Sequence, residues 1–200
     1  MSLNIDLDDF PGPERHLDET GQQRLVVGGG CFWCTEAVFL ALDGVTAVTS
    51  GYAGDREELA NYDAVCSGST DHAEVIEIVY DSATVGLGEL LKIFFSIAHD
   101  PTQVDRQGND RGRQYRSVVF FQSQAQKQYV ADYIRQLDEA GVFDAPIATT
   151  LEPLDVFYTA EAYHQNFAAR NPGQPYVQFS AAPKLEKLAR AHPQRLRRSS

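Results

Sequence analysis

The chain has 200 residues and a formal net charge of −11 at pH 7, with 43% hydrophobic and 22% charged residues. This length and composition predict one globular domain and exclude a disordered chain, a collagen-like repeat and a disulfide scaffold. The acidic balance argues against nucleic acid as a partner, and the longest uncharged stretch, residues 171–183, is too short and too proline-rich to span a membrane.

The two ends of the chain differ in charge. Residues 1–23 are acidic, lack the basic region and apolar run of a secretory signal, and read as an arm that is either wrapped on the surface or disordered. Residues 183–200 carry six Lys and Arg against one acid and read as a solvated, frayed helix end, with RNA or membrane binding as the alternative. We therefore expect a cytoplasmic protein with an N-terminal arm (1–23), a single catalytic domain (24–182) and a basic C-terminal helix or tail (183–200).

Hydrophobic periodicity assigns the regular elements in chain order. Strands are expected where apolar and β-branched residues concentrate: Arg24–Val27, Val45–Tyr52, His72–Tyr80, Arg116–Phe121 and Ile147–Leu151. Helices are expected where apolar residues recur at helical spacing: Cys31–Leu42, Gly88–His99, Ser123–Ala140, Thr159–Arg170 and a segment from Pro183 onward. A polar loop is expected between residues 100 and 116. The order of elements predicts an α+β fold, with a mixed sheet flanked by helices, a split βαβ (ferredoxin-like) core, long loops and a C-terminal extension.

The most informative motif is a C-x-x-C pair at the start of a predicted helix. Cys31 follows a strand and three glycines, so its sulfur is expected at the positive end of the helix, which favours a thiolate. Cys34 lies one turn further on, within reach of a disulfide after a modest adjustment. The spacing alone allows dithiol redox chemistry, half of a metal site or coincidence. Cys66, taken alone, reads as a buried core cysteine.

The segment Gly30-Cys31-Phe32-Trp33 resembles the active-site signature of A-type methionine sulfoxide reductases. Further blocks of that family follow in order over roughly residues 25 to 179: Gly51-Tyr52-Ala53-Gly54, Val65-Cys66-Ser67-Gly68, His72-Ala73-Glu74-Val75, His99-Asp100-Pro101-Thr102, Gln107-Gly108-Asn109-Asp110, Gln114-Tyr115-Arg116-Ser117 and Glu161-Ala162-Tyr163-His164-Gln165. Their number and order make the resemblance very specific.

The resemblance implies roles for individual residues. Cys31 would be the nucleophile that attacks the sulfoxide sulfur, and Glu74 the acid that protonates its oxygen. The strand register supports Glu74, because it shares an apolar face with Ile76 and Ile78, where burial keeps a carboxylic acid neutral; the alternative is an edge glutamate paired with a lysine. The other implied residues are the methyl-binding aromatics Phe32 and Trp33, the oxygen-binding hydroxyls of Tyr62 and Tyr115, and Asp110, which orients substrate or water.

Each of these other residues also has an ordinary structural reading. The two aromatics could be core residues, the tyrosines half-buried packing, and Asp110 a turn former. His164 and Gln165 match the family as well, but a structural role suffices for them, and we do not expect His164 to be catalytic.

The implied reaction is thiol-dependent reduction of methionine-S-sulfoxide, free or in proteins, through a sulfenic acid on Cys31 and then an intramolecular disulfide. An external dithiol, thioredoxin by analogy with the family, would reopen the disulfide. No metal and no organic cofactor is expected. The resemblance thus implies a repair enzyme in the defence against oxidative stress.

The sequence departs from the family in two places. Many members have a glycine where this chain has Cys34, and they carry resolving cysteines near the C-terminus, where the stretch Pro175-Tyr176-Val177-Gln178-Phe179 has none. We therefore expect Cys34 to resolve the sulfenic acid, with Cys66 as the second candidate. Asp71 stands where a glycine often precedes the His-Ala-Glu block.

Two other classes compete with this interpretation. A thioredoxin-like disulfide oxidoreductase also uses C-x-x-C at a helix start, although there the tryptophan precedes the first cysteine, whereas Trp33 lies between the two here. A zinc-binding module could be built from Cys31, Cys34, Cys66 and His72, but the spacing is loose and no second C-x-x-C exists.

Overall fold

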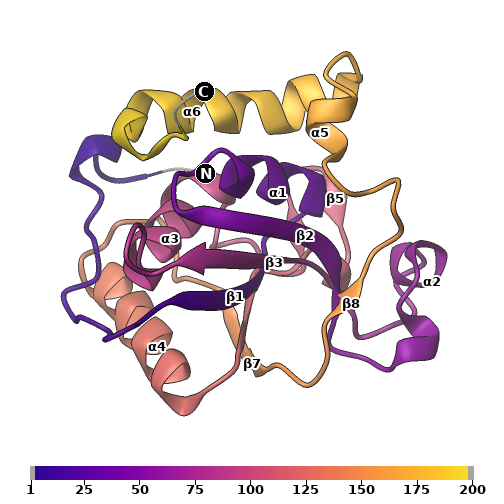
Figure 1. The fold of residues 1–200 in the computed structure, drawn as a ribbon, viewed down its shortest axis with the longest axis horizontal. Coiled ribbons are helices and arrows are strands. Elements are labelled where there is room, and N and C mark those ends of the chain that lie inside the picture. The colour runs from indigo at the N-terminus through magenta and orange to yellow at the C-terminus, as the bar shows by residue number, and fades with distance from the viewer. Residues whose placement is uncertain (1–2, 198–200) are drawn as a thin grey trace.

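The computed structural model describes residues 3–197 and is organised around a six-stranded sheet with the order β7-β6-β1-β3-β2-β8 (Figure 1). Strands β6 and β7 run parallel, and every other neighbouring pair is antiparallel. The strands of this sheet are β1 (Gln22–Gly28), β2 (Val45–Ala53), β3 (Ala73–Asp81), β6 (Val118–Phe121), β7 (Thr150–Pro153) and β8 (Tyr158–Thr159). A separate hairpin consists of β4 (Arg106–Gln107) and β5 (Asp110–Arg111).

The helices are α1 (Phe32–Leu40), α2 (Tyr62–Cys66), α3 (Leu87–Ile93), α4 (Gln124–Glu139), α5 (Phe167–Arg170) and α6 (Ala182–Ala191). Two π-helical turns adjoin them: η3 (Phe94–Ala98) continues α3, and η5 (Val177–Ala181) leads into α6. Short 3₁₀ turns occur at η1 (Leu7–Asp9), η2 (Glu57–Leu59), η4 (Arg113–Tyr115) and η6 (Pro193–Arg195).

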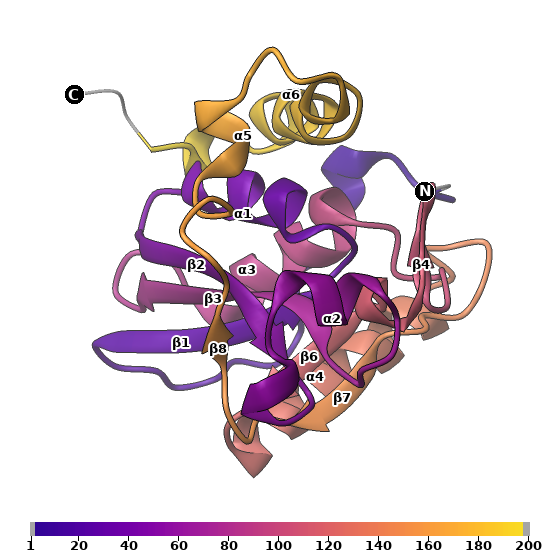
Figure 2. The same cartoon turned by 90° about the vertical axis from the view of Figure 1, so that its right-hand side faces the viewer.

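The four central strands have the connectivity of a split βαβ core. Helix α1 connects β1 to β2, α3 with η3 connects β3 to the later strand β6, and β3 lies between β1 and β2, antiparallel to both. Helix α1 is sandwiched between the sheet and an outer layer formed by α5 and α6 (Figure 2). The predicted α+β class with a ferredoxin-like core is confirmed.

Three predictions of local structure need correction. The strand expected at Ile147–Leu151 lies at Thr150–Pro153, where it pairs with β6. The polar loop over residues 100–116 contains the short β4–β5 hairpin. The helix expected at Thr159–Arg170 is wrong, because only Phe167–Arg170 is α-helical.

Side-chain hydrogen bonds account for the short helix. The amide group of Gln165 bonds both the backbone N–H and the carbonyl of Ser50 on β2, at 2.9 Å each. The carboxylate of Glu36 on α1 accepts hydrogen bonds from the backbone N–H groups of Asn166 and Phe167 at 2.9 and 3.3 Å, which fixes where α5 begins. These long-range partners override the local helical periodicity.

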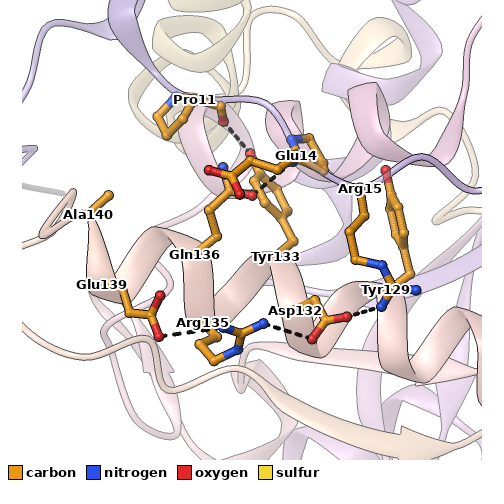
Figure 3. Close-up of a pocket in the computed structure, with 11 residues that line it drawn as sticks. Pro11, Glu14, Arg15, Tyr129, Asp132, Tyr133, Arg135, Gln136, Glu139 and Ala140 are labelled. Atoms are coloured by element: carbon orange, nitrogen blue, oxygen red, sulfur yellow. Dashed lines mark hydrogen bonds and ion pairs between the residues drawn. The ribbon is translucent and has the colours of Figure 1, made fainter.

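The N-terminal arm is packed along α4. The hydroxyl of Tyr133 donates to the carbonyl of Pro11 at 2.7 Å, and Arg15 forms an ion pair with Asp132 (Figure 3). These contacts border a pocket of about 380 Å³ between the arm and α4. Of the two readings of the arm, the wrapped one is correct for the described residues.

Two residues anchor the arm most firmly. Phe10 is only 1% exposed and meets the ring of Phe143 edge-on, with 6.0 Å between the ring centroids. The carboxylate of Glu19 accepts hydrogen bonds from the hydroxyl of Tyr80 at 2.5 Å and from the backbone N–H of Leu87 at 2.9 Å. The arm therefore closes one side of the main core.

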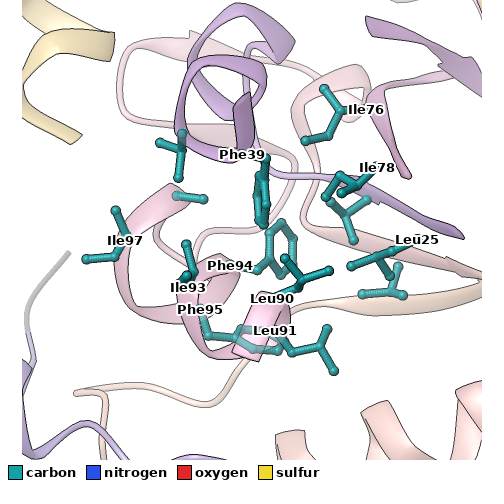
Figure 4. Close-up of a cluster of buried hydrophobic side chains, with 14 of the residues drawn as sticks. Leu25, Phe39, Ile76, Ile78, Leu90, Leu91, Ile93, Phe94, Phe95 and Ile97 are labelled. Atoms are coloured by element: carbon teal, nitrogen blue, oxygen red, sulfur yellow. The ribbon is translucent and has the colours of Figure 1, made fainter. Parts of the chain in front are cut away.

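The main core lies between the sheet and the helices α1, α3 and α4, and it is built from aromatic and branched aliphatic side chains. Those labelled in Figure 4 are Leu25, Phe39, Ile76, Ile78, Leu90, Leu91, Ile93, Phe94, Phe95 and Ile97. A smaller cluster covers the opposite face of the sheet: Val26, Ala53, Ala73, Val75, Val118 and Phe120. Strand β3 is thus covered on both faces along its first half, which positions polar groups on it away from water.

The basic C-terminal segment is docked rather than frayed. The backbone N–H of Asp43 donates to the carbonyl of Arg195 at 2.8 Å, and that of Arg197 donates to Ala41 at 2.9 Å. Residues 198–200 of the predicted tail, and residues 1–2 of the predicted arm, lie outside the described residues. Within the part that is described, no helix combines the length and apolar character needed to cross a membrane.

Replacing Phe10 with Ala is expected to lower the free energy of unfolding by about 3–5 kcal/mol, because a fully buried aromatic ring leaves a cavity. Urea unfolding monitored by circular dichroism measures this. The control, Val104→Ala, alters a side chain that is 70% exposed, and it should change stability by less than about 0.5 kcal/mol. A Phe10→Ala protein as stable as the wild type would show that the arm is not anchored.

Candidate active site

Three glycines bring the end of β1 into close contact with its neighbours. A Cβ atom on Gly28 would lie 2.8 Å from the carbonyl oxygen of Glu74, and one on Gly29 would lie 2.8 Å from the imidazole ring of His99. Both distances are shorter than real Cβ contacts, so larger residues would push the chain away from β3. The glycines therefore allow the segment that leads into Cys31 to pass directly beside Glu74.

Gly30 then turns the chain into α1. Its φ of +83° belongs to the left-handed region, and a Cβ there would meet the side chain of Gln107 at 2.6 Å. Cys31 is the N-cap of α1, and the backbone N–H of Phe32 donates to Oε2 of Glu74 at 3.1 Å. One free amide of the first helical turn thus fixes the carboxyl group beside Cys31.

Glu74 is a buried acid. It lies on the face of β3 that also carries Ile76 and Ile78, and it is 2% exposed. Burial raises the pKa of Glu74 to about 8; the hydrogen bond from Phe32 lowers it, and the negative charge of Asp110 raises it further. At neutral pH this carboxyl group holds a proton. The alternative of an edge glutamate paired with lysine is wrong.

Cys31 and Cys34 form a reduced dithiol that lines a pocket of about 780 Å³. Cys31 is 9% exposed and Cys34 is 2% exposed, and their side chains share a hydrogen bond. Burial raises the pKa of Cys31 well above its usual range, and the hydrogen bond with Cys34 and the charge of Glu74 add to this rise. The same hydrogen bond lowers the pKa of Cys34 to about 7, against its burial.

Two opposing influences act on Cys31: its position at the start of α1 favours the thiolate, as expected from the sequence, and burial opposes it. Because the two sulfurs share a hydrogen bond, the first proton is lost by the dithiol as a whole, and the remaining proton lies between the two sulfurs. The sulfur of Cys31 nevertheless borders the pocket and has an acid close by.

Tyr176 completes the surroundings of the dithiol and was not predicted as a site residue. Its hydroxyl donates to Oδ2 of Asp110 at 2.6 Å and lies close enough to Cys31 and Cys34 to lower the pKa of both thiols. Asp110 on β5 is thus more than a turn former. The signal for it in the sequence is an aromatic residue in the stretch Pro175–Phe179, which contains no cysteine.

The side chains of Tyr62 and Tyr115 both lie close to the thiol of Cys66. Tyr62 begins α2 and Tyr115 ends η4, and both hydroxyls hydrogen-bond with the Cys66 thiol. Burial raises the pKa of both tyrosines, and the charge of Glu74 raises them further, so both hydroxyls keep their protons. Cys66 is half-buried, with its pKa raised by burial, so the reading as a fully buried core cysteine is wrong.

Phe32 and Trp33 form an aromatic wall next to this group. Phe32 is 1% exposed, and the centroid of its ring lies 5.0 Å from the centroid of the His164 ring. The indole N–H of Trp33 donates to Nδ1 of His164 at 3.0 Å, and its ring stacks on Phe167 with centroids 3.8 Å apart. His164 is fully buried and holds Trp33 in place, which agrees with the expected structural role.

The residues proposed for zinc do not form a metal site. His72 is buried and its Nε2 pairs with the carbonyl of Arg56 at 3.0 Å. Among residues 3–197, no group of three His, Cys, Asp or Glu side chains is arranged to hold a metal ion. The site instead combines a dithiol, a protonated carboxylic acid and neutral tyrosine hydroxyls.

Known proteins are similar to this chain in sequence and in fold. The family model described as "Peptide methionine sulfoxide reductase" matches residues 23–196. Peptide methionine sulfoxide reductase MsrA 2 of Synechocystis sp. is 53% identical over 180 residues, which cover 90% of this chain and 84% of that protein. Mxr1 from Saccharomyces cerevisiae in reduced form superposes with a TM-score of 0.70 at 34% identity, covering 83% of this chain and 94% of that one. Mxr1 in complex with Trx2 superposes with a TM-score of 0.50 at 26% identity, covering 80% and 94%.

Glu74 should make stability fall as pH rises. The folded protein keeps this proton up to about pH 8, whereas the unfolded chain loses it near the ordinary glutamate pKa of 4.5, so unfolding releases a proton between these limits. Relative to Glu74→Gln, the wild type should lose about 1.4 kcal/mol per pH unit across this range. Urea unfolding at pH 5, 6.5 and 8 measures it.

Glu77→Gln serves as the matched control for this measurement. Glu77 lies on the opposite face of β3 and pairs with Arg24. If the wild type and Glu74→Gln show the same dependence of stability on pH, Glu74 is ionised in the folded state.

Proposed function

The chain belongs to the peptide methionine sulfoxide reductase family, and we propose that it reduces methionine sulfoxide to methionine at the sulfur of Cys31, with Glu74 as the acid. The observation that carries this assignment is the hydrogen bond from the Phe32 amide to the buried Glu74 carboxyl group, which sets a protonated acid beside the N-cap cysteine. The enzyme is an oxidoreductase of the A type.

The first step transfers oxygen from the substrate to the protein. The dithiol has already lost one proton to solvent, and its remaining proton moves along the shared hydrogen bond to the Cys34 sulfur, which leaves the thiolate on Cys31. This thiolate attacks the sulfoxide sulfur while Glu74 gives its proton to the oxygen. The S–O bond of the substrate breaks, methionine leaves, and Cys31 becomes a sulfenic acid.

Neutral donors and aromatic rings bind the substrate. Tyr62 and Tyr115 offer phenolic hydroxyls to the sulfoxide oxygen, which would replace the Cys66 thiol as their hydrogen-bond partner. Phe32 and Trp33 provide the apolar wall for the methyl group. Asp110 acts through Tyr176, whose hydroxyl it holds against the dithiol. The proposed substrate is the S epimer at sulfur, as the resemblance to the family implies.

Cys34 resolves the sulfenic acid. Its thiol is hydrogen-bonded to Cys31, which lowers its pKa, whereas Cys66 lies against the two tyrosines. A disulfide between Cys31 and Cys34 results, and an external dithiol reopens it. Mxr1, a relative of known structure, has been crystallised with Trx2, which supports thioredoxin as that dithiol. The cycle as proposed uses no metal and no organic cofactor.

The cell compartment and the division of the chain are part of the same proposal. Three free cysteines are consistent with a reducing compartment such as the cytoplasm. Residues 24–182 would form the catalytic domain, with the arm (1–23) and the basic segment (183–200) packed on it.

Replacing Cys34 with Ser should allow about one methionine per protein molecule and then stop, because thioredoxin would meet a sulfenic acid instead of a disulfide. Methionine released from methionine-S-sulfoxide, quantified by chromatography with thioredoxin as the reductant, measures this. Cys66→Ser is the matched control and should turn over continuously. Sustained turnover by Cys34→Ser would refute Cys34 as the resolving residue.

Activity should fall above about pH 8, as Glu74 loses its proton. Glu74→Gln should reduce the single-turnover rate at pH 7 by about 10²–10⁴-fold and remove this alkaline decline, since the amide cannot donate an acidic proton. Rapid-quench measurements from pH 6 to pH 9.5 test both points, with Cys31→Ser as the inactive reference. A variant that retains the wild-type rate would eliminate Glu74 as the acid.

A further inference from the structure

The basic C-terminal helix α6 directs two lysines toward the end of η3. Nζ of Lys184 donates to the carbonyl of Ala98 at 2.6 Å, and Nζ of Lys187 donates to the carbonyl of Ser96, also at 2.6 Å. Carbonyl groups at the C-terminal end of a helix attract cations, so both lysines have the same structural function there.

The two lysines differ in their relation to the dithiol. Lys184 borders the pocket into which Cys31 and Cys34 open, and Lys187 does not. The hydrogen bond with Cys31 is the largest influence that lowers the pKa of Cys34, and the positive charge of Lys184 lowers it further against burial.

We propose that Lys184 is a positioning residue of the dithiol, whose ammonium group stabilises negative charge on the Cys34 sulfur whenever the catalytic cycle places it there. The proposal rests on the proposed function, in which Cys34 carries this charge in two steps. It also gives the basic end of the chain a role that the sequence did not reveal.

In the first of these steps, Cys34 loses to solvent the proton that it received from Cys31, and its thiolate attacks the sulfur of the Cys31 sulfenic acid. An S–S bond forms, the S–O bond breaks, and hydroxide leaves as water after taking up a proton from solvent. The sulfenic acid is the group reduced, and the two thiol sulfurs end as a disulfide.

In the second step, a thiolate of the external dithiol attacks the Cys31 sulfur, which is the more exposed of the two. The S–S bond breaks, and its electron pair goes to Cys34, which leaves as a thiolate. The second thiol of the reductant then displaces Cys31, so that the reductant becomes a disulfide and the protein regains its dithiol. A leaving group of low pKa departs faster, so a cation beside Cys34 aids this step.

Groups from several elements face the dithiol. Cys31 hydrogen-bonds with Cys34, Tyr176 lowers the pKa of Cys34, and Asp110 on β5 raises it. Negative charge on Cys34 raises the pKa of Glu74 on β3. Lys184 on α6 is the cation in this set, and it offsets the effect of Asp110.

The test uses the full chain with Lys184→Met, which keeps the length of the side chain and removes its charge. The rate of thioredoxin-dependent turnover is measured from pH 5.5 to pH 9, and the dithiol is titrated by thiolate absorbance in a Cys66→Ser background. We expect the midpoint of the titration and the acid limb of turnover to rise by about one pH unit. Turnover at pH 7 should fall about two- to fivefold. A smaller fraction of Cys34 is ionised at this pH, but the more basic thiolate is a better nucleophile, which offsets part of the loss.

Three further variants separate charge from structure. Lys187→Met loses the equivalent hydrogen bond on η3 and should keep the wild-type titration and pH profile. Lys184→Arg retains the charge and should restore both. Lys184→Gln, a second neutral variant, covers the case in which Lys184→Met does not fold, and should shift both in the same direction.

A wild-type titration in the neutral Lys184 variants, or an equal shift in Lys187→Met, would overturn the role of Lys184. Failure of the proposed function itself has a different signature, because the wild-type protein would then release no methionine from the sulfoxide. The two outcomes are therefore distinguishable in the same set of measurements.

Discussion

The hydrogen bond from the Phe32 amide to the Glu74 carboxyl group is the contact on which the rest of the site depends. It ties the first turn of α1 to β3, and it sets Cys31 beside an acid that is 2% exposed. A charged carboxylate would be costly at this depth, so the position that orients the group also keeps it protonated. The contact needs Gly28 to pass close to β3, and a one-residue slip of that strand would turn Glu74 to the opposite face.

The sequence predicted the parts of this arrangement that are local. The order of strands and helices was sufficient to predict the ferredoxin-like core. The alternation of residues along β3 was sufficient to predict that Glu74 shares the buried face with Ile76 and Ile78. The sequence could not predict Tyr176, because that residue lies in an irregular stretch whose position is set by contacts with distant segments. The sequence also could not predict the burial that opposes ionisation of Cys31, because the start of a helix is visible in a sequence, whereas the depth of burial around a sulfur is not.

The dithiol obtains its surroundings from segments far apart in the chain. The hairpin of β4 and β5 contributes Asp110, the stretch before η5 contributes Tyr176, and α6 contributes Lys184. The C-terminal end of the chain thus supplies a phenol and an ammonium group to the surroundings of the dithiol. In the proposed cycle both sulfurs belong to the C-x-x-C motif, and the proposed role of the C-terminal region is to tune these thiols instead of adding another.

The composition of the core has a consequence for durability. The packed interior consists of phenylalanine, leucine, isoleucine and valine with a few smaller or hydroxylated neighbours, and the only methionine in the sequence is Met1. Oxidants that convert a buried thioether into a polar sulfoxide disrupt the packing around it. From its second residue onward this chain presents no thioether to such oxidants, so the repair catalyst does not accumulate, in its own interior, the lesion that it removes from other molecules.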